Sequence, residues 1–395
     1  MKAVGIIAEY NPFHNGHAYH LQEAKRVTGA DAAVVVMSGN FVQRGEPAIL
    51  DKWERTKLAL HNGADLMVEL PVFSVVQPGH LFAEGAVKIL AALGVEELVF
   101  GSEHPEIDFM DLAKQAEAIQ TEDKKADKAQ TYAAAYAAEL EEQTGFKLED
   151  PNDILAFSYA KAVLKLGLSM KLHPIARKEA AYHDQTIDED QEIASASSIR
   201  LALHKGKWEK VERVVPKDTL EALKEKPNTL AFEGIFFNLL RYRLLTDTVG
   251  QLGQVYQMAE GLEHRLVGVA TAKEAPQSYQ SFIKAVKSKR YTFARMQRTM
   301  LYTLLNIKVD QMQAAMADSY IRLLGFTDQG QAYLSEVKRK ARLPIISRVD
   351  QGLAKANLRL DYKAGLIWQL LAEQSNSQNQ QDLTRRPIHY IREED

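Results

Sequence analysis

The chain has 395 residues, of which 46% are hydrophobic and 26% charged, and its formal net charge is −3. This length allows two domains and a large buried core, and the composition is that of an ordinary water-soluble protein. The small net charge means that any surface for nucleic acid has to be local. Because the chain contains no cysteine, disulfides, thiol catalysis and thiolate metal sites are excluded.

The N-terminus carries one lysine and a short apolar stretch, which is far too short for a signal peptide. No run approaches the roughly eighteen apolar residues that a membrane span needs. We therefore expect a cytoplasmic protein whose partners include neither a membrane nor DNA.

An unbroken apolar run opens the chain and leads at once into turn residues. Residues 3–8 predict a first strand that is buried on both faces. Asn11-Pro12 predicts a non-helical turn, because the residue before proline is pushed out of the α region. Past Gly16 apolar residues recur at helical spacing, at Ala18, Leu21, Ala24 and Val27.

His14 and His17 bracket Gly16 at this strand-to-helix junction. Backbone N–H groups and the positive end of a helix point at such a junction, which makes it a natural phosphate site. Gly16 removes a side chain where the backbone would approach phosphates closely, and each histidine can donate to the bridging oxygens of a triphosphate. The HxGH arrangement resembles the signature of the nucleotidyltransferase superfamily. The alternative is an N-terminal cap with two solvated histidines.

Strand and helix patterns alternate through the first half of the chain. Further strands are predicted at 32–37, 65–71, 97–102 and 171–177, with helices between them. This alternation predicts a Rossmann-like doubly wound parallel sheet, in which ligands bind at the carboxyl ends of the strands near the switch point. From about Pro216 onward helical periods dominate. We therefore expect a nucleotidyltransferase-like ATP-binding domain over 1–215 and a mainly α-helical domain over 216–395.

A second chemical pattern begins at Ser195, where small hydroxyl residues open a helix. Ser197 and Ser198 offer donors to an anion, and Arg200 adds a positive charge. The segment resembles the second nucleotidyltransferase motif, which holds the β- and γ-phosphates. Arg200 follows the serine pair by only two residues, so the sequence leaves open which serine of 195–198 contacts phosphate; a plain serine cap is the alternative.

Asn152, at a predicted helix start, and Arg177, at the end of the fifth predicted strand, also fall near the switch point. A plain cap and a surface arginine are equally consistent with these two positions. Histidines at 14, 17 and 20 lack an accompanying carboxylate, so we expect no metal site. The chain has no GxxxxGK loop and no G-x-S-x-G sequence, which excludes P-loop and nucleophile-elbow chemistry.

Basic residues gather in the second half, interleaved with Tyr291 and Phe293 and without an acidic residue among them. Such a run suits phosphate neutralisation and base stacking, although a solvated helix face is the alternative. The candidate RNA-binding residues are Lys284, Lys287, Lys289, Arg290, Arg295 and Arg298.

Several segments together resemble the bacterial tRNA(Met) cytidine acetate ligase family: MKAVGIIAEYNPFHNGH, VVMSGNFVQRGEPA, ADLMVELP, LVFGSE, SASSIR and, later, GLEHR, KRYT and YIRLLG. The resemblance implies that acetate and ATP form acetyl-adenylate and pyrophosphate. The acetyl group then passes to the wobble cytidine of elongator tRNA(Met). By this resemblance the ATP site comprises Ile7, Ala8, Glu9, Tyr10, Asn11, Pro12, Phe13, His14, Asn15, Gly16, His17, His20, Gly101, Asn152 and Arg177.

The residues suit this chemistry, because attack on an α-phosphate needs positioning and charge stabilisation more than covalent help. Mg²⁺ is expected to accompany ATP, although no carboxylate pair stands out to hold it. Two alternatives remain open: a small-molecule adenylyltransferase, for which the basic helical half would be surplus, and an RNA-binding module whose nucleotide site is structural.

Overall fold

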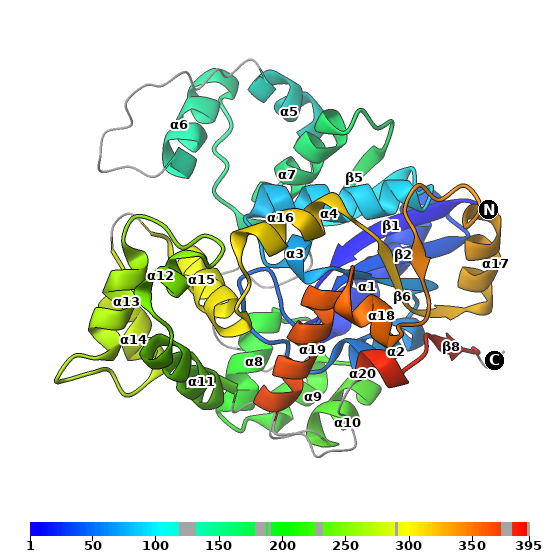
Figure 1. The fold of residues 1–395 in the computed structure, drawn as a ribbon. Helices are drawn as coiled ribbons and strands as arrows, with labels where there is room; N and C mark the ends of the chain where they lie inside the picture. The colour runs from blue at the N-terminus through cyan, green and yellow to red at the C-terminus, as the bar shows by residue number, and fades with distance from the viewer. Residues whose placement is uncertain are drawn as a thin grey trace.

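The computed structural model describes residues 1–117, 132–177, 187–188, 191–225, 232–288, 291–372 and 381–392. A mixed sheet of eight strands runs through it (Figure 1). The strand order is β5-β4-β1-β2-β3-β6-β7, and β8 pairs with β6. Among the described residues no helix is both long and apolar enough to cross a membrane.

Five parallel strands form the predicted doubly wound part: β1 (Ala3–Ala8), β2 (Ala32–Ser38), β3 (Leu66–Leu70), β4 (Glu97–Ser102) and β5 (Lys171–Ala176). Every residue of β2 and β3 is buried, as their unbroken apolar runs predict. After β3 the chain crosses back to place β4 on the other side of β1. The switch point therefore lies between β1 and β4, where the HxGH segment leaves the sheet. The predicted fold is confirmed.

Helices cover both faces of this sheet, because alternate strand residues point to opposite sides. One core joins the sheet to α4 (Gly79–Ala92), α5 (Phe109–Glu117) and α7 (Pro151–Lys165). The other joins it to α1 (Asn15–Thr28), α2 (Lys52–His61), α8 (Ala196–His204), α9 (Trp208–Val214) and α10 (Lys217–Glu225). The short α3 (Val72–Val75) follows β3, and α6 (Tyr132–Thr144) precedes α7.

The second half is mainly helical, as expected. Its helices are α11 (Phe232–Thr246), α12 (Val249–Gly253), α13 (Leu262–Ala270), α14 (Tyr279–Val286), α15 (Phe293–Leu305), α16 (Val309–Ala317), α17 (Asp328–Val337), α18 (Gln351–Lys355), α19 (Arg359–Leu371) and α20 (Gln381–Thr384). Figure 1 shows α11–α14 grouped on the far side of α15 from the sheet.

Strands do not end at Pro216, which corrects one part of the sequence interpretation. β6 (Ile321–Thr327) pairs antiparallel with β3, and β7 (Ile345–Ile346) and β8 (Ile388–Tyr390) pair with β6. The apolar run of β6 is too short for its period to separate a buried strand from a buried helix. The late part of the chain thus returns to the first sheet, and the division between residues 215 and 216 stays a prediction.

Candidate nucleotide-binding site

Two stacked imidazoles occupy the start of α1. His14 is the N-cap residue and is 2% exposed, and its ring lies on that of His17 with centroids 3.6 Å apart and planes 25° from parallel. The backbone N–H of His14 donates to Nδ1 of His17 over 3.3 Å. A neutral His17 therefore carries its proton on Nε2, from which it can donate to a ligand.

All three histidines of this segment are neutral near pH 7. Burial, together with the positive charge of Arg177, lowers the pKa of His14 to about 3. Burial is also the main cause that holds the pKa of His17 well below its usual value and lowers that of His20 to about 4. His20 Nε2 lies 3.2 Å from the carbonyl oxygen of Val99, which ties α1 to β4. His20 thus has a structural partner, whereas the stacked pair stands at the strand-to-helix junction.

Gly16 is needed here for a different reason from the one the sequence suggested. A Cβ atom at this position would lie 2.9 Å from Cε1 of His14 and 3.2 Å from Cγ2 of Ile193. The predicted reason was close approach of phosphate to the backbone. In the structure the ring of His14 fills the space that a side chain would need.

The turn between β1 and α1 is fixed by its neighbours. Tyr10 has a positive φ of 51°, and the Asn11–Pro12 peptide bond is cis. The backbone N–H of Ile49 donates to Oδ1 of Asn11 over 2.8 Å. Tyr10 also places its ring edge against that of His17, with centroids 4.7 Å apart. The turn therefore holds the histidine pair from one side.

Arg55 organises this turn and was missed by sequence reasoning. Its fully buried guanidinium donates to the carbonyl oxygens of Glu9, Ser38 and Leu50 over 2.5, 3.1 and 3.0 Å. It donates also to the carbonyl of Gly39. One arginine thus joins the loops after β1 and β2. A single basic residue on a helix normally predicts a solvated side chain, so no sequence signal pointed to it.

The second motif lies against the first, although about 180 residues separate them. Arg200 Nη1 donates to the carbonyl oxygen of Asn11 over 2.8 Å, and Asn15 Nδ2 donates to that of Glu192 over 2.8 Å. This contact brings the predicted phosphate-binding segments together at one edge of the sheet.

The three serines of the second motif have different surroundings. Ser195 is the N-cap of α8 and accepts from the backbone N–H of Ser198. The two hydroxyl oxygens of Ser195 and Ser198 lie 2.5 Å apart, and Ser198 is 5% exposed. Ser197 is exposed. The hydroxyl that faces solvent at the start of this helix is therefore that of Ser197.

Gly101 and Arg177 lie together at the carboxyl ends of β4 and β5. A Cβ atom at Gly101 would lie 3.1 Å from Cγ of Arg177, so the arginine crosses directly over the glycine. The charge of Arg177 also lowers the pKa of His14, His17 and His20. The structure therefore brings the predicted arginine and the three predicted histidines into one site.

Asn152 is not the cap of its helix. The N-cap of α7 is Asp150, and Asn152 Nδ2 donates to Oε1 of Glu103 over 2.6 Å. This bond holds the first turn of α7 against the loop that follows β4. Asn152 is thus held at the loop after β4 by a side-chain contact that the sequence did not predict.

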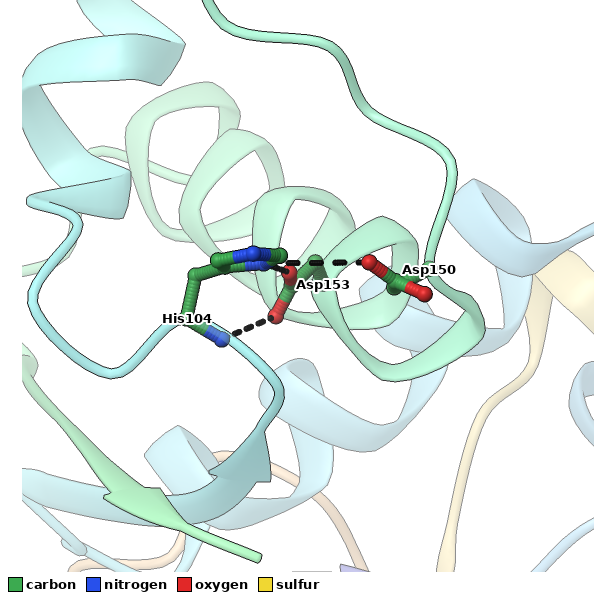
Figure 2. A group of neighbouring side chains, drawn as sticks. All are labelled: His104, Asp150 and Asp153. Atoms are coloured by element: carbon green, nitrogen blue, oxygen red, sulfur yellow. Dashed lines mark hydrogen bonds and ion pairs between the residues drawn. The ribbon is translucent and has the colours of Figure 1, made fainter. Parts of the chain in front are cut away.

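A histidine and two aspartates anchor the same loop, as Figure 2 shows. Asp153 is 1% exposed and accepts from Ser102 Oγ over 2.6 Å and from the backbone of Glu103 over 3.0 Å. His104 Nδ1 lies 2.6 Å from the other oxygen of Asp153, and this hydrogen bond raises the pKa of His104. Among the described residues, one ligand atom each from His104, Asp150 and Asp153 lie within 4.8 Å of one another. Because both oxygens of Asp153 already accept hydrogen bonds, we interpret the group as an anchor.

The predicted RNA-binding residues do not share one environment. Lys284 and Lys287 are exposed, and Arg295 lies over the ring of Tyr291 at 4.6 Å. Lys289 and Arg290 fall outside the described residues. Arg298 differs from the others because it is 6% exposed.

A buried charge cluster lies behind the loop that follows β2. Lys52 is 1% exposed and forms ion pairs with Glu69 at 2.7 Å and with Asp382 of α20 at 2.6 Å. Desolvation raises the pKa of Glu69 to about 7. The backbone N–H of Lys52 also donates to Oδ1 of Asn40 over 2.9 Å. The cluster therefore connects the C-terminal segment to the loop between β2 and α2, and sequence reasoning did not find it.

The chain resembles known proteins over nearly its whole length. Residues 1–383 match the family model described as HIGH Nucleotidyl Transferase. A Leuconostoc citreum protein named tRNA(Met) cytidine acetate ligase is 67% identical over 99% of this chain and 98% of its own length. A Leuconostoc mesenteroides protein of the same name is 62% identical over 99% and 100%. The chain belongs to the tRNA(Met) cytidine acetate ligase family.

Solved structures agree with this membership. The crystal structure of apo Thermotoga maritima TmcAL is 32% identical, with a TM-score of 0.88 over 99% of this chain and 100% of that chain. The same protein bound with alpha-thio ATP gives a TM-score of 0.86 at the same identity and coverage. The family resemblance that the sequence motifs predicted is confirmed.

Proposed function

We propose that this protein is an ATP-dependent ligase that activates acetate as acetyl-adenylate. The acetyl group then passes to the exocyclic amine of the wobble cytidine of elongator tRNA(Met), giving N4-acetylcytidine. The observation that carries the proposal is the stacked, neutral pair of His14 and His17 beside Arg177, in a chain of this family. A cytoplasmic location belongs to the proposal, because tRNA is the acceptor.

In the first step a carboxylate oxygen of acetate attacks the α-phosphorus of ATP. The bond from phosphorus to the α,β-bridging oxygen breaks, and pyrophosphate leaves with the electron pair. Charge therefore grows on the bridging oxygen and the β-phosphate. Preorganised donors at that place stabilise the transition state more than the ground state.

His14 and His17 suit this role because they are neutral and buried. An imidazole N–H donates to the leaving oxygen without needing a change of protonation, and the hydrogen-bonded Nδ1 of His17 directs its donor outward from Nε2. The start of α1 adds backbone N–H groups and the helix dipole. Arg177, Arg200 and the hydroxyl of Ser197 are assigned to the outer phosphates, and Gly101 and Asn152 to the nucleoside side.

Mg²⁺ is proposed to accompany ATP through its phosphate oxygens. The carboxylates next to Gly101 do not form a ready site for the ion, because Asp153 accepts from Ser102 and Glu103 accepts from Asn152. Mg²⁺ commonly keeps several waters and binds through substrate phosphates.

In the second step the amine of cytidine attacks the acetyl carbonyl carbon of the mixed anhydride. The bond from that carbon to the phosphate oxygen breaks, AMP leaves, and the new amide loses one proton. An anhydride is reactive enough that holding the two groups together supplies most of the acceleration. The protein therefore needs a surface that binds the tRNA with its wobble cytidine next to the acetyl-adenylate.

We assign that surface to the segment that carries Lys284, Lys287 and Arg295, with Lys289 and Arg290 from the same run. Exposed lysines and an arginine stacked on Tyr291 suit phosphate contacts and base stacking. The segment runs from α14 into α15, and Figure 1 places α15 between the helical group and the sheet.

ATP–pyrophosphate exchange with the purified protein tests the proposal and separates its rivals. Exchange that depends on acetate supports the ligase. Exchange that depends on a phosphorylated metabolite would support a small-molecule adenylyltransferase, and no exchange would support an RNA-binding module. Mass analysis of tRNA(Met) from a deletion strain tests the product, which we expect to lack the acetyl group at the wobble cytidine.

A further inference from the structure

Arg298 is a buried cation for which the described residues provide no ion-pair partner. The residue is 6% exposed, and its Nε is buried without a hydrogen-bond partner. Burial lowers its pKa, and the neighbouring groups that act on it are Tyr302, Arg295 and Tyr256, with no carboxylate among them. An arginine does not lose its proton in a protein, and an unpaired buried charge is strongly unfavourable. Most buried arginines are therefore paired, as Arg55 is with four carbonyl groups.

The two tyrosines beside Arg298 are engaged elsewhere. Tyr302 donates its hydroxyl to the carbonyl oxygen of Val76, and Tyr256 donates to Oε1 of Gln77 over 3.4 Å. These contacts hold α15 and the segment after α12 to the loop before α4. They leave Nε of Arg298 without an acceptor among the described residues.

The position of Arg298 adjoins the nucleotide site. A Cβ atom at Gly45 would lie 3.1 Å from the backbone N and Cα of Arg298, so α15 rests directly on the loop after β2. In that loop Glu46 accepts from Gln297 over 2.9 Å and lies 3.8 Å from Arg200, which in turn holds the carbonyl of Asn11. The side chains of Glu46 and Arg200 thus connect the helix of Arg298 to the turn before the HxGH motif.

Further positive charge gathers around the same place. The charges of Lys161, Lys165 and Arg298 all act to lower the pKa of His80, after burial as the largest cause. Glu84 opposes them, but it forms an ion pair with Lys165 at 2.8 Å. His80, in the first turn of α4, therefore stands among positively charged side chains of α7 and α15.

We propose that Arg298 binds an oxyanion of the second substrate, either the carboxylate of the acid that is activated or a phosphate of the RNA. The inference rests on the proposed function, and it adds one residue to the part of the site that binds the substrates other than ATP. A guanidinium offers two parallel donors, which match a carboxylate or a phosphate. The described residues provide no ion-pair partner for this charge, and the substrate supplies the anion.

Arg298→Gln tests this, with Arg298→Lys as the charge-retaining variant and Arg241→Gln of neighbouring α11 as the matched control. We measure Tm, the KM for acetate and for ATP in exchange, and the Kd for a tRNA(Met) transcript at several salt concentrations. If the ligand is a carboxylate, R298Q raises the KM for acetate by about tenfold to a hundredfold and leaves the KM for ATP unchanged. If it is a phosphate, R298Q raises the Kd for tRNA by a similar factor and flattens the log–log salt slope by about one. The control changes neither constant.

Stability distinguishes a binding role from a structural one. Removal of an unpaired buried charge is expected to leave the Tm of R298Q equal to or above that of the wild type. The proposal would be overturned if R298Q had a lower Tm that R298K restored, while both variants kept the wild-type KM for acetate and the wild-type Kd for tRNA. Unchanged constants at unchanged Tm would overturn it as well.

Failure of the proposed function has a separate outcome. Wild-type exchange that does not depend on acetate would refute the ligase assignment. In that case Arg298 is tested by the rise in Tm that inorganic phosphate causes in the wild type. Loss of this rise in R298Q supports the oxyanion site, and an equal rise in R298Q refutes the site.

Discussion

Replacement of Gly16 by alanine tests the geometry of the histidine pair. The added Cβ would lie 2.9 Å from Cε1 and 3.0 Å from Nδ1 of His14, whereas ordinary contacts of this kind are about half an ångström longer. The ring of His14 has to move by at least that difference. Because it stacks on His17 at 3.6 Å, the two donors move together. A misplacement of about 1 Å can cost about a hundredfold in rate, so we expect kcat for acetate-dependent exchange to fall by about tenfold to a hundredfold.

The assay is ATP–pyrophosphate exchange, with circular dichroism and Tm to show that the fold is kept. Alanine is the better helix former by about 1 kcal/mol, so Gly16→Ala is not expected to unfold α1. The matched control is Gly234→Ala in α11, where an added Cβ meets nothing within 4 Å. A wild-type kcat in a folded Gly16→Ala protein would show that the position of the His14 ring does not matter for catalysis.

Three further predictions address the same site and its partner. His17→Ala is expected to lower adenylate formation by about a hundredfold or more with the fold intact; wild-type exchange would remove His17 from the mechanism. Burial lowers the pKa of His14 to about 3 and of His20 to about 4, so the unfolded chain binds more protons below its own histidine pKa of about 6.5. As the pH is lowered from about 6.5 to 4, the unfolding free energy should fall by up to about 1.4 kcal/mol per pH unit for each histidine. Urea titrations at several pH values should show a weaker pH dependence of the unfolding free energy for His20→Asn than for the wild type. Replacing Lys287, Arg290 and Arg295 by alanine should weaken tRNA binding and flatten its salt slope by about one per lost contact, while exchange survives; loss of exchange at unchanged tRNA affinity would give the segment a structural role.

The sequence was sufficient for the strands and turns that local patterns determine. The strand expected at 97–102 matches β4, and Ser195 caps the helix that it was expected to open. These features depend on residues that are neighbours in the chain. The pairing of the first and second motifs was also predictable, because their order follows a known family.

Features that depend on distant contacts could not be predicted. Arg55 and Arg298 have the sequence context of surface residues, yet both are buried. Arg55 is paired with four carbonyls, whereas Nε of Arg298 has no acceptor among the described residues. β6 is hidden among helical periods, and its pairing with β3, β7 and β8 defines it as a strand. Gly16 was identified as necessary, but the atom that requires it belongs to His14.

The ion pair between Lys52 and Asp382 has a consequence for the order in which the protein can fold during synthesis. Lys52 stands at the start of the helix that also carries Arg55, and Arg55 holds the loop after β1. Until residue 382 has left the ribosome, the buried ammonium of Lys52 lacks one of its two carboxylates, and β8 is absent from the sheet. A nascent chain that already contains every residue of the nucleotide site therefore still lacks its finished support. The support is complete once α20 and β8 have been synthesised and have packed against the earlier part of the chain.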